Sequence, residues 1–306
     1  MTTVTLAEAG KLTQNDLVSG VIENVVTTNP VFNLIPFEPI NGNAKAYNRE
    51  NALGDVQTLG VGGTITAKTA ASFTTVTTTL TTIIGDAEVN GLIIAQGVGD
   101  ADGSSHAAVQ IASKAKSVGR KYQDLWFNGI YTGSPQTGAA DFDGLVQLLS
   151  AGQSTAYSGT DWFTNLDVML HSVKSKDGQV DVISMSERDL RTHRRKLRAL
   201  GGATPERVDV NGVTFEAYAG VIVLPSGYIT QSGSPLTDTI YAYNFDDGSE
   251  KVGLVGLTST RNAGLHVESV GPKETADESI WRVKWYCAMA AYSDLALAGL
   301  TGVPAD

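Results

Sequence analysis

The chain has 306 residues, 42% of them hydrophobic and 18% charged, so it can bury a sizeable core and is not disordered throughout. Its 32 acidic and 22 basic residues give a formal charge of −10, which argues against a protein that grips nucleic-acid phosphate with a broadly basic surface. A single cysteine, Cys287, leaves no room for an internal disulfide or a thiolate zinc site. The length suggests about two domains of roughly 150 residues each.

Targeting segments are not evident. The residues after Met1 are polar and include Glu8 and Lys11, in place of the basic and apolar regions of a signal peptide. The longest apolar stretch, residues 285–300, contains Ser293 and Asp294, so we expect no membrane span and a cytoplasmic site of synthesis.

The first 43 residues are predicted to form an arm with little core of its own. Three apolar residues spaced four apart, Leu17, Val21 and Val25, favour a short amphipathic helix over residues 11–26. Three prolines within residues 30–39 then favour an extended path.

Residues 44–84 are predicted to form a long β-hairpin. Ten threonines lie between residues 64 and 82, and threonine is β-branched and suits strands. The expected limbs are residues 44–50 and 72–84, with a glycine-rich tip near residue 60. Such a hairpin has few apolar residues and is marginal by itself in water. It is either an ordinary solvated hairpin or a loop stabilised by lying on another subunit.

Residues 105–131 carry the clearest periodic pattern, with apolar or small residues at alternating steps of four and three: Ile111, Ala115, Val118, Tyr122, Leu125 and Gly129. Asp102, Ser104 or Ser105 could cap this helix. At 1.5 Å per residue its length is roughly 39 Å, against a radius of gyration of about 19 Å for a compact chain of this size. We therefore expect a strut that spans the molecule; a coiled coil is the less favoured reading.

From residue 141 onward, helices and strands alternate in a mixed α/β unit. The predicted helices are residues 142–149, 161–173 and 186–200, and the predicted strands are 180–184, 212–218, 221–224 and 240–243. Two long strands follow at 264–270 and 280–289, and in the second Trp281, Val283, Trp285 and Cys287 share one face.

No catalytic or metal-binding constellation is apparent. The four histidines, His106, His171, His193 and His266, are far apart in the chain and have no cysteine cluster beside them. The segment 97–103 has the wrong glycine spacing for a dinucleotide loop and is only a fragment of a calcium loop. We therefore expect no enzyme, no cofactor and no bound metal.

Six of the 22 basic residues lie within residues 188–198. On a helix, Arg188, Arg191, Arg195 and Arg198 share one face, opposite Leu190, Leu197 and Leu200. This face is either solvated and paired with nearby acids, which we favour, or a subunit contact that meets acidic groups of a neighbour. DNA binding is the weakest of the three interpretations, given the overall charge.

The order of these parts resembles the major capsid proteins of tailed double-stranded-DNA bacteriophages, whose Hong Kong 97-type fold is shared with encapsulins. Short phrases carry the resemblance at matching places: FNLIPF at 32–37, AYNRE at 46–50, FNG at 127–129, FDGL at 142–145, DVISMS at 181–186, GLVGL at 253–257 and RVKWY at 282–286.

The resemblance implies an α+β fold in six segments. These are an amino-terminal arm (1–43), an extended hairpin loop (44–84), a peripheral domain with the spine helix (85–140), an axial domain (141–262), returning peripheral strands (263–290), and a last axial strand with the carboxyl terminus (291–306).

The resemblance also implies a structural function as a capsid subunit in the virion, assembled in the host cytoplasm into hexamers and pentamers that enclose double-stranded DNA without reading its sequence. The implied partners are further copies of the chain, a separate scaffolding protein, a portal and a decoration protein, with no membrane. The residues expected at subunit contacts are Tyr47, Arg49, Glu50, Lys68, Phe73, Arg188, Arg191, Arg195 and Arg198. We expect no amino-terminal cleavage and no covalent linkage between subunits.

Two alternatives stay open. An encapsulin-type compartment shell has the same fold but encloses cargo enzymes, which nucleic-acid extraction distinguishes. A β-rich hydrolase or carbohydrate-binding protein, suggested by the threonine- and glycine-rich strands and four tryptophans, predicts a monomer or a small oligomer.

Overall fold

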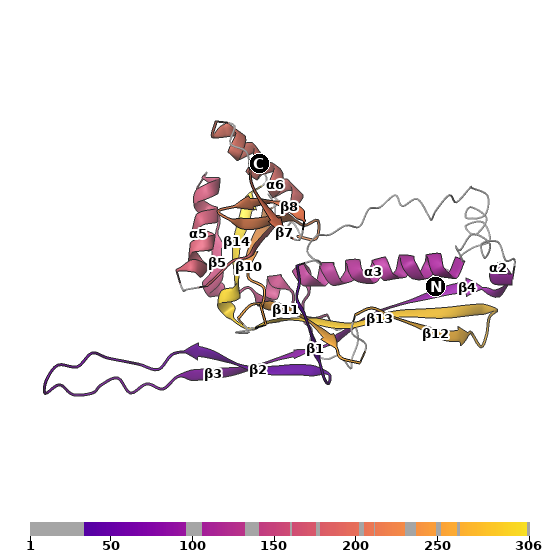
Figure 1. The fold of residues 1–306 in the computed structure, drawn as a ribbon, viewed down its shortest axis with the longest axis horizontal. Coiled ribbons are helices and arrows are strands. Elements are labelled where there is room, and N and C mark those ends of the chain that lie inside the picture. The colour runs from indigo at the N-terminus through magenta and orange to yellow at the C-terminus, as the bar shows by residue number, and fades with distance from the viewer. Residues whose placement is uncertain are drawn as a thin grey trace.

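The computed structural model describes residues 34–95, 106–131, 141–159, 161–175, 178–201, 205–210, 212–229, 237–248, 252–261 and 264–304. Its strands form a five-stranded sheet, a seven-stranded sheet and a separate two-stranded hairpin. A long helix lies along the five-stranded sheet, the seven-stranded sheet stands at one end of that helix, and the hairpin projects beyond both (Figure 1).

The five-stranded sheet is built around one long strand, β13 (Glu278–Ala291). Strand β4 (Thr81–Asn90) pairs with one edge of β13, and β12 (His266–Pro272) and β11 (Leu254–Ser259) share the other. Strand β1 (Phe37–Ile40) adds to β11 in parallel. The predicted alternation in β13 is confirmed at its centre, since Val283, Trp285 and Cys287 are buried. The residues at 282, 284 and 286 beside them are only half-buried.

Helix α3 (His106–Asn128) covers β4 and β13, as the periodic pattern predicts, and α2 (Gly91–Ala95) precedes it. Its 23 residues give a rod of about 35 Å. The proposed capping residues 102, 104 and 105 lie outside the described residues. Tyr122 is fully buried at the centre of the contact, with its ring 4.6 Å from that of Trp285 and 5.8 Å from that of Phe37.

The seven-stranded sheet has a second core. Its strand order is β5 (Ser154–Ala156), β14 (Leu297–Pro304), β10 (Thr237–Tyr243), β6 (Val182–Met185), β9 (Val221–Pro225), β8 (Val213–Tyr218) and β7 (Glu206–Val210). Helices α4 (Leu145–Leu148), α5 (Trp162–Lys174) and α6 (Glu187–Ala199) belong to the same part of the chain. Asp161 and Ser186 cap α5 and α6, because each side chain accepts a hydrogen bond from a first-turn backbone N–H.

Two expectations about elements need correction. The second limb of the hairpin, β3 (Ser72–Thr79), ends before residue 84, because the chain leaves the hairpin and enters β4. Residues 254–259, placed by expectation in the 141–262 unit, form β11, which pairs with β13 in the other sheet. The described end of the arm packs on the body, where Ile35 and Ile40 are buried in the main cluster. The helix expected over residues 11–26 lies outside the described residues.

Candidate subunit-contact surface

The two-stranded hairpin is held to the body by one face of its first strand. Strand β2 (Ala44–Ala52) pairs antiparallel with β3, with Tyr47 opposite Val76. In β2, Lys45, Tyr47 and Arg49 are half-buried and the residues between them are exposed. This alternation follows from the period of two in a strand, so one face of the hairpin rests on the protein and the other meets solvent.

We call the contacts of these three side chains the hairpin anchor. The Arg49 guanidinium donates to the backbone oxygens of Ala291 (2.6 Å) and Tyr292 (3.1 Å) and forms an ion pair with Asp294. The Tyr47 hydroxyl donates to the Ala291 oxygen at 2.8 Å. These bonds tie the hairpin to the segment that leaves β13, so its direction relative to the body is set at its base.

The anchor also has a half-buried ionic part. Lys45 Nζ donates to the Tyr292 hydroxyl at 2.6 Å and forms an ion pair with Glu38, and Tyr292 in turn donates to Glu38. Burial and the Glu38 carboxylate raise the pKa of Tyr292 well above its usual range, so its phenol stays protonated. Burial likewise raises the pKa of Tyr47, whose ring meets that of Tyr292 edge-on at 5.1 Å.

We expect Arg49→Ala to loosen the hairpin without unfolding the rest of the subunit. The change removes two bonds from a charged donor and one ion pair, and such bonds contribute about 1.5–3 kcal/mol each at most. Hydrogen–deuterium exchange in β2 and β3 should rise by about tenfold or more. Glu50→Ala, which removes the next side chain from the solvent-facing side, is the control and should leave exchange in both strands unchanged.

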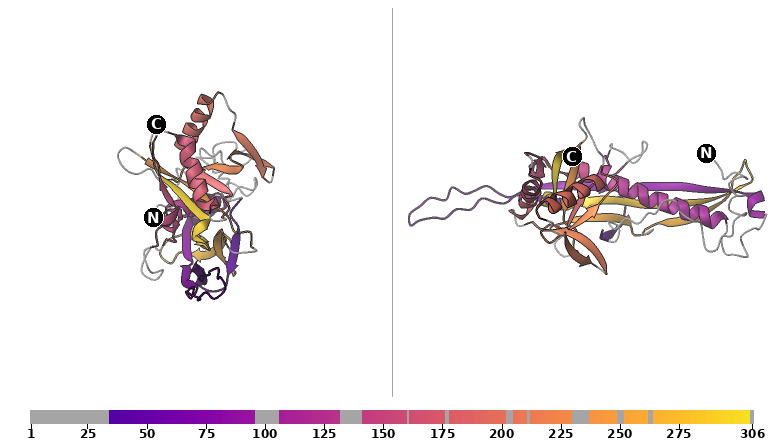
Figure 2. Two further views of the ribbon diagram at one scale, coloured as in Figure 1. Left: turned by 90° about the vertical axis from the view of Figure 1, so that its left-hand side faces the viewer. Right: turned by 90° about the horizontal axis from the view of Figure 1, so that it is seen from above.

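Beyond the anchor, the hairpin presents apolar side chains to solvent. Val56 is 89% exposed, Leu53 79% and Phe73 66%, and Val61 at the far turn is fully exposed. The loop extends beyond the other drawn elements at its end of the molecule, as Figure 1 and the right-hand view of Figure 2 show. Large apolar side chains on so thin a projection cannot pack into the core of their own subunit, and such surfaces mark contacts with a partner.

The nine predicted contact residues therefore fall into separate environments. Tyr47 and Arg49 are engaged in the anchor, whereas Glu50, Phe73 and Lys68 are exposed on the hairpin. On α6, Arg191, Arg195 and Arg198 are exposed and Arg188 is turned into the protein. The structure does not bring the hairpin residues and the α6 residues together. Lys45, Tyr292 and the exposed aliphatic residues of the loop were missed, although the alternation in β2 pointed to Lys45.

Arg188 belongs to a buried cluster of charges. Its guanidinium lies 3.2 Å from Asp189 and 3.1 Å from Asp238, and both carboxylates are almost completely buried. Ser186 donates to Asp238, and Arg188 also donates to the Val303 backbone oxygen. Burial, followed by the nearby Asp238, raises the pKa of Asp189 to about 6, because one cation serves two carboxylates.

This cluster predicts a pH dependence of stability. The raised pKa means that the folded state holds a proton on Asp189 that the unfolded chain releases near pH 4, so the contribution is complete below pH 4 and is lost as the pH rises through about 6. Burial lowers the pKa of His193, which acts in the opposite direction over the same range. The informative quantity is therefore the difference in the free energy of unfolding between the wild type and Asp189→Asn.

We expect the free energy of unfolding of wild type, relative to Asp189→Asn, to fall by about 1–2 kcal/mol between pH 5 and pH 7.5. Urea unfolding at each pH measures it. Glu187→Gln, an exposed acid in the same helical turn, should run parallel to the wild type. Parallel profiles for Asp189→Asn and the wild type would contradict the assignment.

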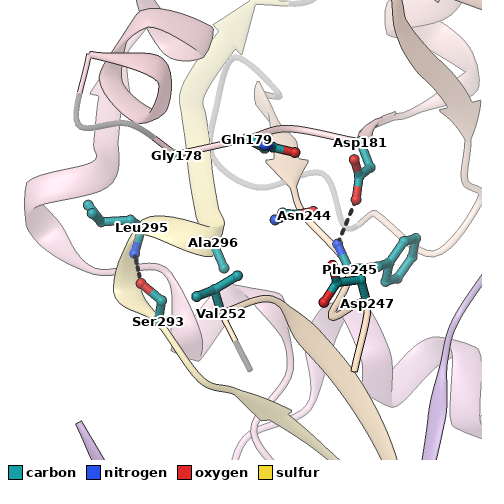
Figure 3. Close-up of a pocket in the computed structure, with 10 residues that line it drawn as sticks. All are labelled: Gly178, Gln179, Asp181, Asn244, Phe245, Asp247, Val252, Ser293, Leu295 and Ala296. Atoms are coloured by element: carbon teal, nitrogen blue, oxygen red, sulfur yellow. Dashed lines mark hydrogen bonds between the residues drawn. The ribbon is translucent and has the colours of Figure 1, made fainter. Parts of the chain in front are cut away.

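A cleft of about 400 Å³ lies where the chain passes between the two sheets (Figure 3). Its lining includes Asp181, whose carboxylate accepts from the Phe245 backbone N–H at 3.0 Å, and Ser293, whose hydroxyl accepts from the Leu295 N–H at 3.1 Å. Both side chains are engaged in hydrogen bonds to nearby backbone N–H groups. The described lining contains no histidine and no lysine. Among the described residues, no group of three or more histidine, cysteine or acidic side chains is placed to hold a metal ion.

No helix in the described part of the chain has the length and apolar character needed to cross a membrane. No protein-family model and no curated protein matches the chain.

Solved structures do match it over nearly its whole length. The SrpI encapsulin of Synechococcus elongatus PCC 7942 aligns with a TM-score of 0.72 and 17% identity, over 99% of this chain and 97% of that one. The capsid of a native GTA particle aligns with a TM-score of 0.64 and 10% identity, over 97% and 98%. A Microbacterium phage Oxtober96 chain aligns with a TM-score of 0.60 and 16% identity, over 99% and 100%.

The chain therefore has a two-sheet α+β fold with a long strut helix and an outlying hairpin, the fold of the solved structures that it matches. More particularly, the chain has the Hong Kong 97-type fold, as the resemblance implied, and phage capsid and encapsulin structures share it.

Proposed function

We propose that this protein is the major capsid subunit of a tailed bacteriophage, a structural protein that assembles into pentamers and hexamers around double-stranded DNA. The observation that carries the proposal is the hairpin. Its base is fixed to the subunit by the anchor, whereas its far part exposes Leu53, Val56 and Val61. A loop that is held in one direction and has an apolar end is suited to lie on a neighbouring copy. Such a contact supplies buried area, which association needs in order to offset the translational and rotational freedom that each subunit loses.

Other parts of the proposal follow from the same reading. The five-stranded sheet with α3 would be the peripheral domain, and the seven-stranded sheet the axial domain. Glu50, Lys68 and Phe73 on the hairpin and Arg191, Arg195 and Arg198 on α6 are the proposed contact residues. Tyr47 and Arg49 would act by directing the hairpin, and Arg188 by stabilising the start of α6. Scaffolding, portal and decoration proteins would be separate partners, and the subunit would have no enzymatic role.

The test is the size of the purified protein's assemblies. Light scattering and negative-stain microscopy should show capsomers or closed shells. A stable monomer in dilute buffer, with the hairpin protected from exchange along its full length, would overturn the proposal.

An encapsulin-type shell is the second candidate, favoured by the TM-score of 0.72 to the SrpI encapsulin. The two proposed functions differ in what the particles enclose. Particles purified from the native source should yield double-stranded DNA if the capsid proposal holds, and protein cargo without packaged DNA if the second candidate holds.

A further inference from the structure

A buried hydrogen bond between two side chains joins helix α5 to helix α6. Trp162 Nε1 of α5 lies 3.0 Å from His193 Nδ1 of α6, and both residues are almost completely buried. An indole N–H can only donate, so His193 Nδ1 is the acceptor. The imidazole is therefore neutral in this structure and carries its proton on Nε2.

The surroundings of His193 favour this neutral form. The rings of Phe163 and Tyr218 lie 5.7 Å and 5.6 Å from the imidazole, and burial lowers the pKa of His193. A proton added to Nδ1 would also face the indole N–H, which would place two donors 3.0 Å apart. The bond to Trp162 and a charged imidazole therefore exclude each other.

The charged groups on the neighbouring elements do not compensate for a lost bond. Glu216 of β8 attracts a charged imidazole, but its carboxylate already accepts from the Arg194 guanidinium at 2.7 and 3.0 Å. Arg194 itself repels a charged imidazole. On α5, the Asp167 carboxylate accepts from the Tyr218 hydroxyl at 2.7 Å.

The remaining charged groups of this helix pair are engaged with other partners. Hydrogen bonds from Thr164 and, to a smaller extent, the positive charge of Lys196 lower the pKa of Asp161. Asp189, one turn before the imidazole on α6, accepts from Arg188. Glu216 is therefore the acid that acts on His193, and Arg194 balances its charge.

His193 is also the last buried residue of α6. The buried residues of this helix, Asp189, Leu190, Thr192 and His193, all lie in its first half. After His193 the side chains of α6 are half-buried or exposed. The bond to Trp162 thus fixes α6 at the point where the helix leaves the core of the seven-stranded sheet.

We infer that His193 is a pH-sensitive attachment of α6, which holds the helix to α5 while the imidazole is neutral and frees it when the imidazole is protonated. A solvated imidazole titrates near pH 6.5, so the attachment contributes fully above that pH and is lost as the pH falls below it. Arg191, Arg195 and Arg198 lie on the same helix. A pH dependence of the contact assigned to them would follow, and that consequence rests on the proposed function.

Hydrogen–deuterium exchange of the purified full-length protein tests the attachment, with His193→Asn as the informative variant. Its amide oxygen takes the place of Nδ1, so Trp162 keeps an acceptor that does not titrate. Comparison at equal pH cancels the intrinsic effect of pH on exchange and the opposing titration of Asp189. The ratio of wild-type to variant protection in α6 should fall by about tenfold between pH 7.5 and pH 5. The upper limit is about 30-fold, because protonation near pH 6.5 favours the opened helix by that factor at pH 5.

Two further variants complete the test. His171→Asn makes the same change at an exposed histidine of α5 and should follow the wild type at both pH values. Trp162→Phe keeps an aromatic ring but removes the donor. It should lower the protection of α6 severalfold at pH 7.5 and respond less than the wild type to acid.

Three results would overturn the inference: a ratio of wild type to His193→Asn that stays constant between the two pH values, a comparable fall with His171→Asn as the reference, or an equal fall in β14, which would mean that the whole sheet opens. Light scattering at both pH values follows assembly separately. Assembly with a constant α6 ratio refutes the attachment alone. A protein that assembles at neither pH refutes the proposed function, whereas a falling α6 ratio would still establish the attachment.

Discussion

Replacing residues 54–70 with an Asn-Gly turn should abolish shell assembly and leave the subunit folded. The removed segment contains Val56, Leu59, Val61 and Ile65, which are all at least half exposed and make no core within the subunit. An Asn-Gly turn closes a two-stranded hairpin of this kind, so β2 and β3 can still pair. Circular dichroism and urea unfolding should match the wild type, and light scattering should show no particles above capsomer size.

A milder double variant distinguishes the effect of apolar contact on assembly from the effect of loop length. Val56→Ser with Val61→Ser keeps every residue of the loop and removes two aliphatic side chains, each worth about 1.5–3 kcal/mol when fully buried at a contact. Assembly should then need a higher protein concentration. Thr66→Ser, an exposed change in the same loop, is the control. Normal shells from the shortened hairpin would show that the loop does not join subunits.

Tyr122→Ala should cost about 3–5 kcal/mol of the free energy of unfolding, the range for truncating a large buried aromatic residue. The Tyr122 ring is fully buried and lies 4.6 Å from Trp285 of β13, 5.5 Å from Phe142 and 5.8 Å from Phe37 of β1. It therefore joins the spine helix to two strands and to the chain segment before α4, and its loss leaves a cavity at their junction.

Urea unfolding measures this loss, and Tyr122→Phe distinguishes the ring from the hydroxyl. The phenylalanine variant keeps the packing and should recover most of the stability. Tyr131→Ala, at an exposed position just beyond the same helix, should change stability by less than about 1 kcal/mol. A loss for Tyr122→Ala no larger than that of Tyr131→Ala would contradict the central place given to this ring.

Local pattern predicted several elements well. The steps of four and three between Ile111 and Leu125 predicted α3. The helices predicted over residues 161–173 and 186–200 begin at the residues that cap α5 and α6. The alternation around Trp285 predicted the buried face of β13. These signals are strong because the spacing of apolar residues within a helix or strand shows which of its faces is buried. That spacing can be read without knowing the element's partner.

Pairing between distant segments was harder to predict. The threonine-rich run from Ser72 to Ile84 contains no glycine or proline, yet its first part pairs with β2 and its last part with β13. Strand β11 follows β10 of the seven-stranded sheet in the chain, but it pairs with β13 and β1 in the five-stranded sheet. In both cases the partner strand is remote in the chain, and no local period identifies it.

By itself, the sequence determined that this protein has a long amphipathic strut, a polar hairpin too poor in apolar residues to fold alone, and one arginine-rich helix in an acidic chain. Only the tertiary structure decided which of the charged side chains are engaged within the subunit. It places Arg188 against two buried carboxylates and uses Arg49, together with Tyr47, to hold the hairpin, whereas Arg191, Arg195 and Arg198 stay exposed. The reason is physical: a charge pairs with whatever folding brings within a few ångströms, and that neighbour usually comes from a distant part of the chain.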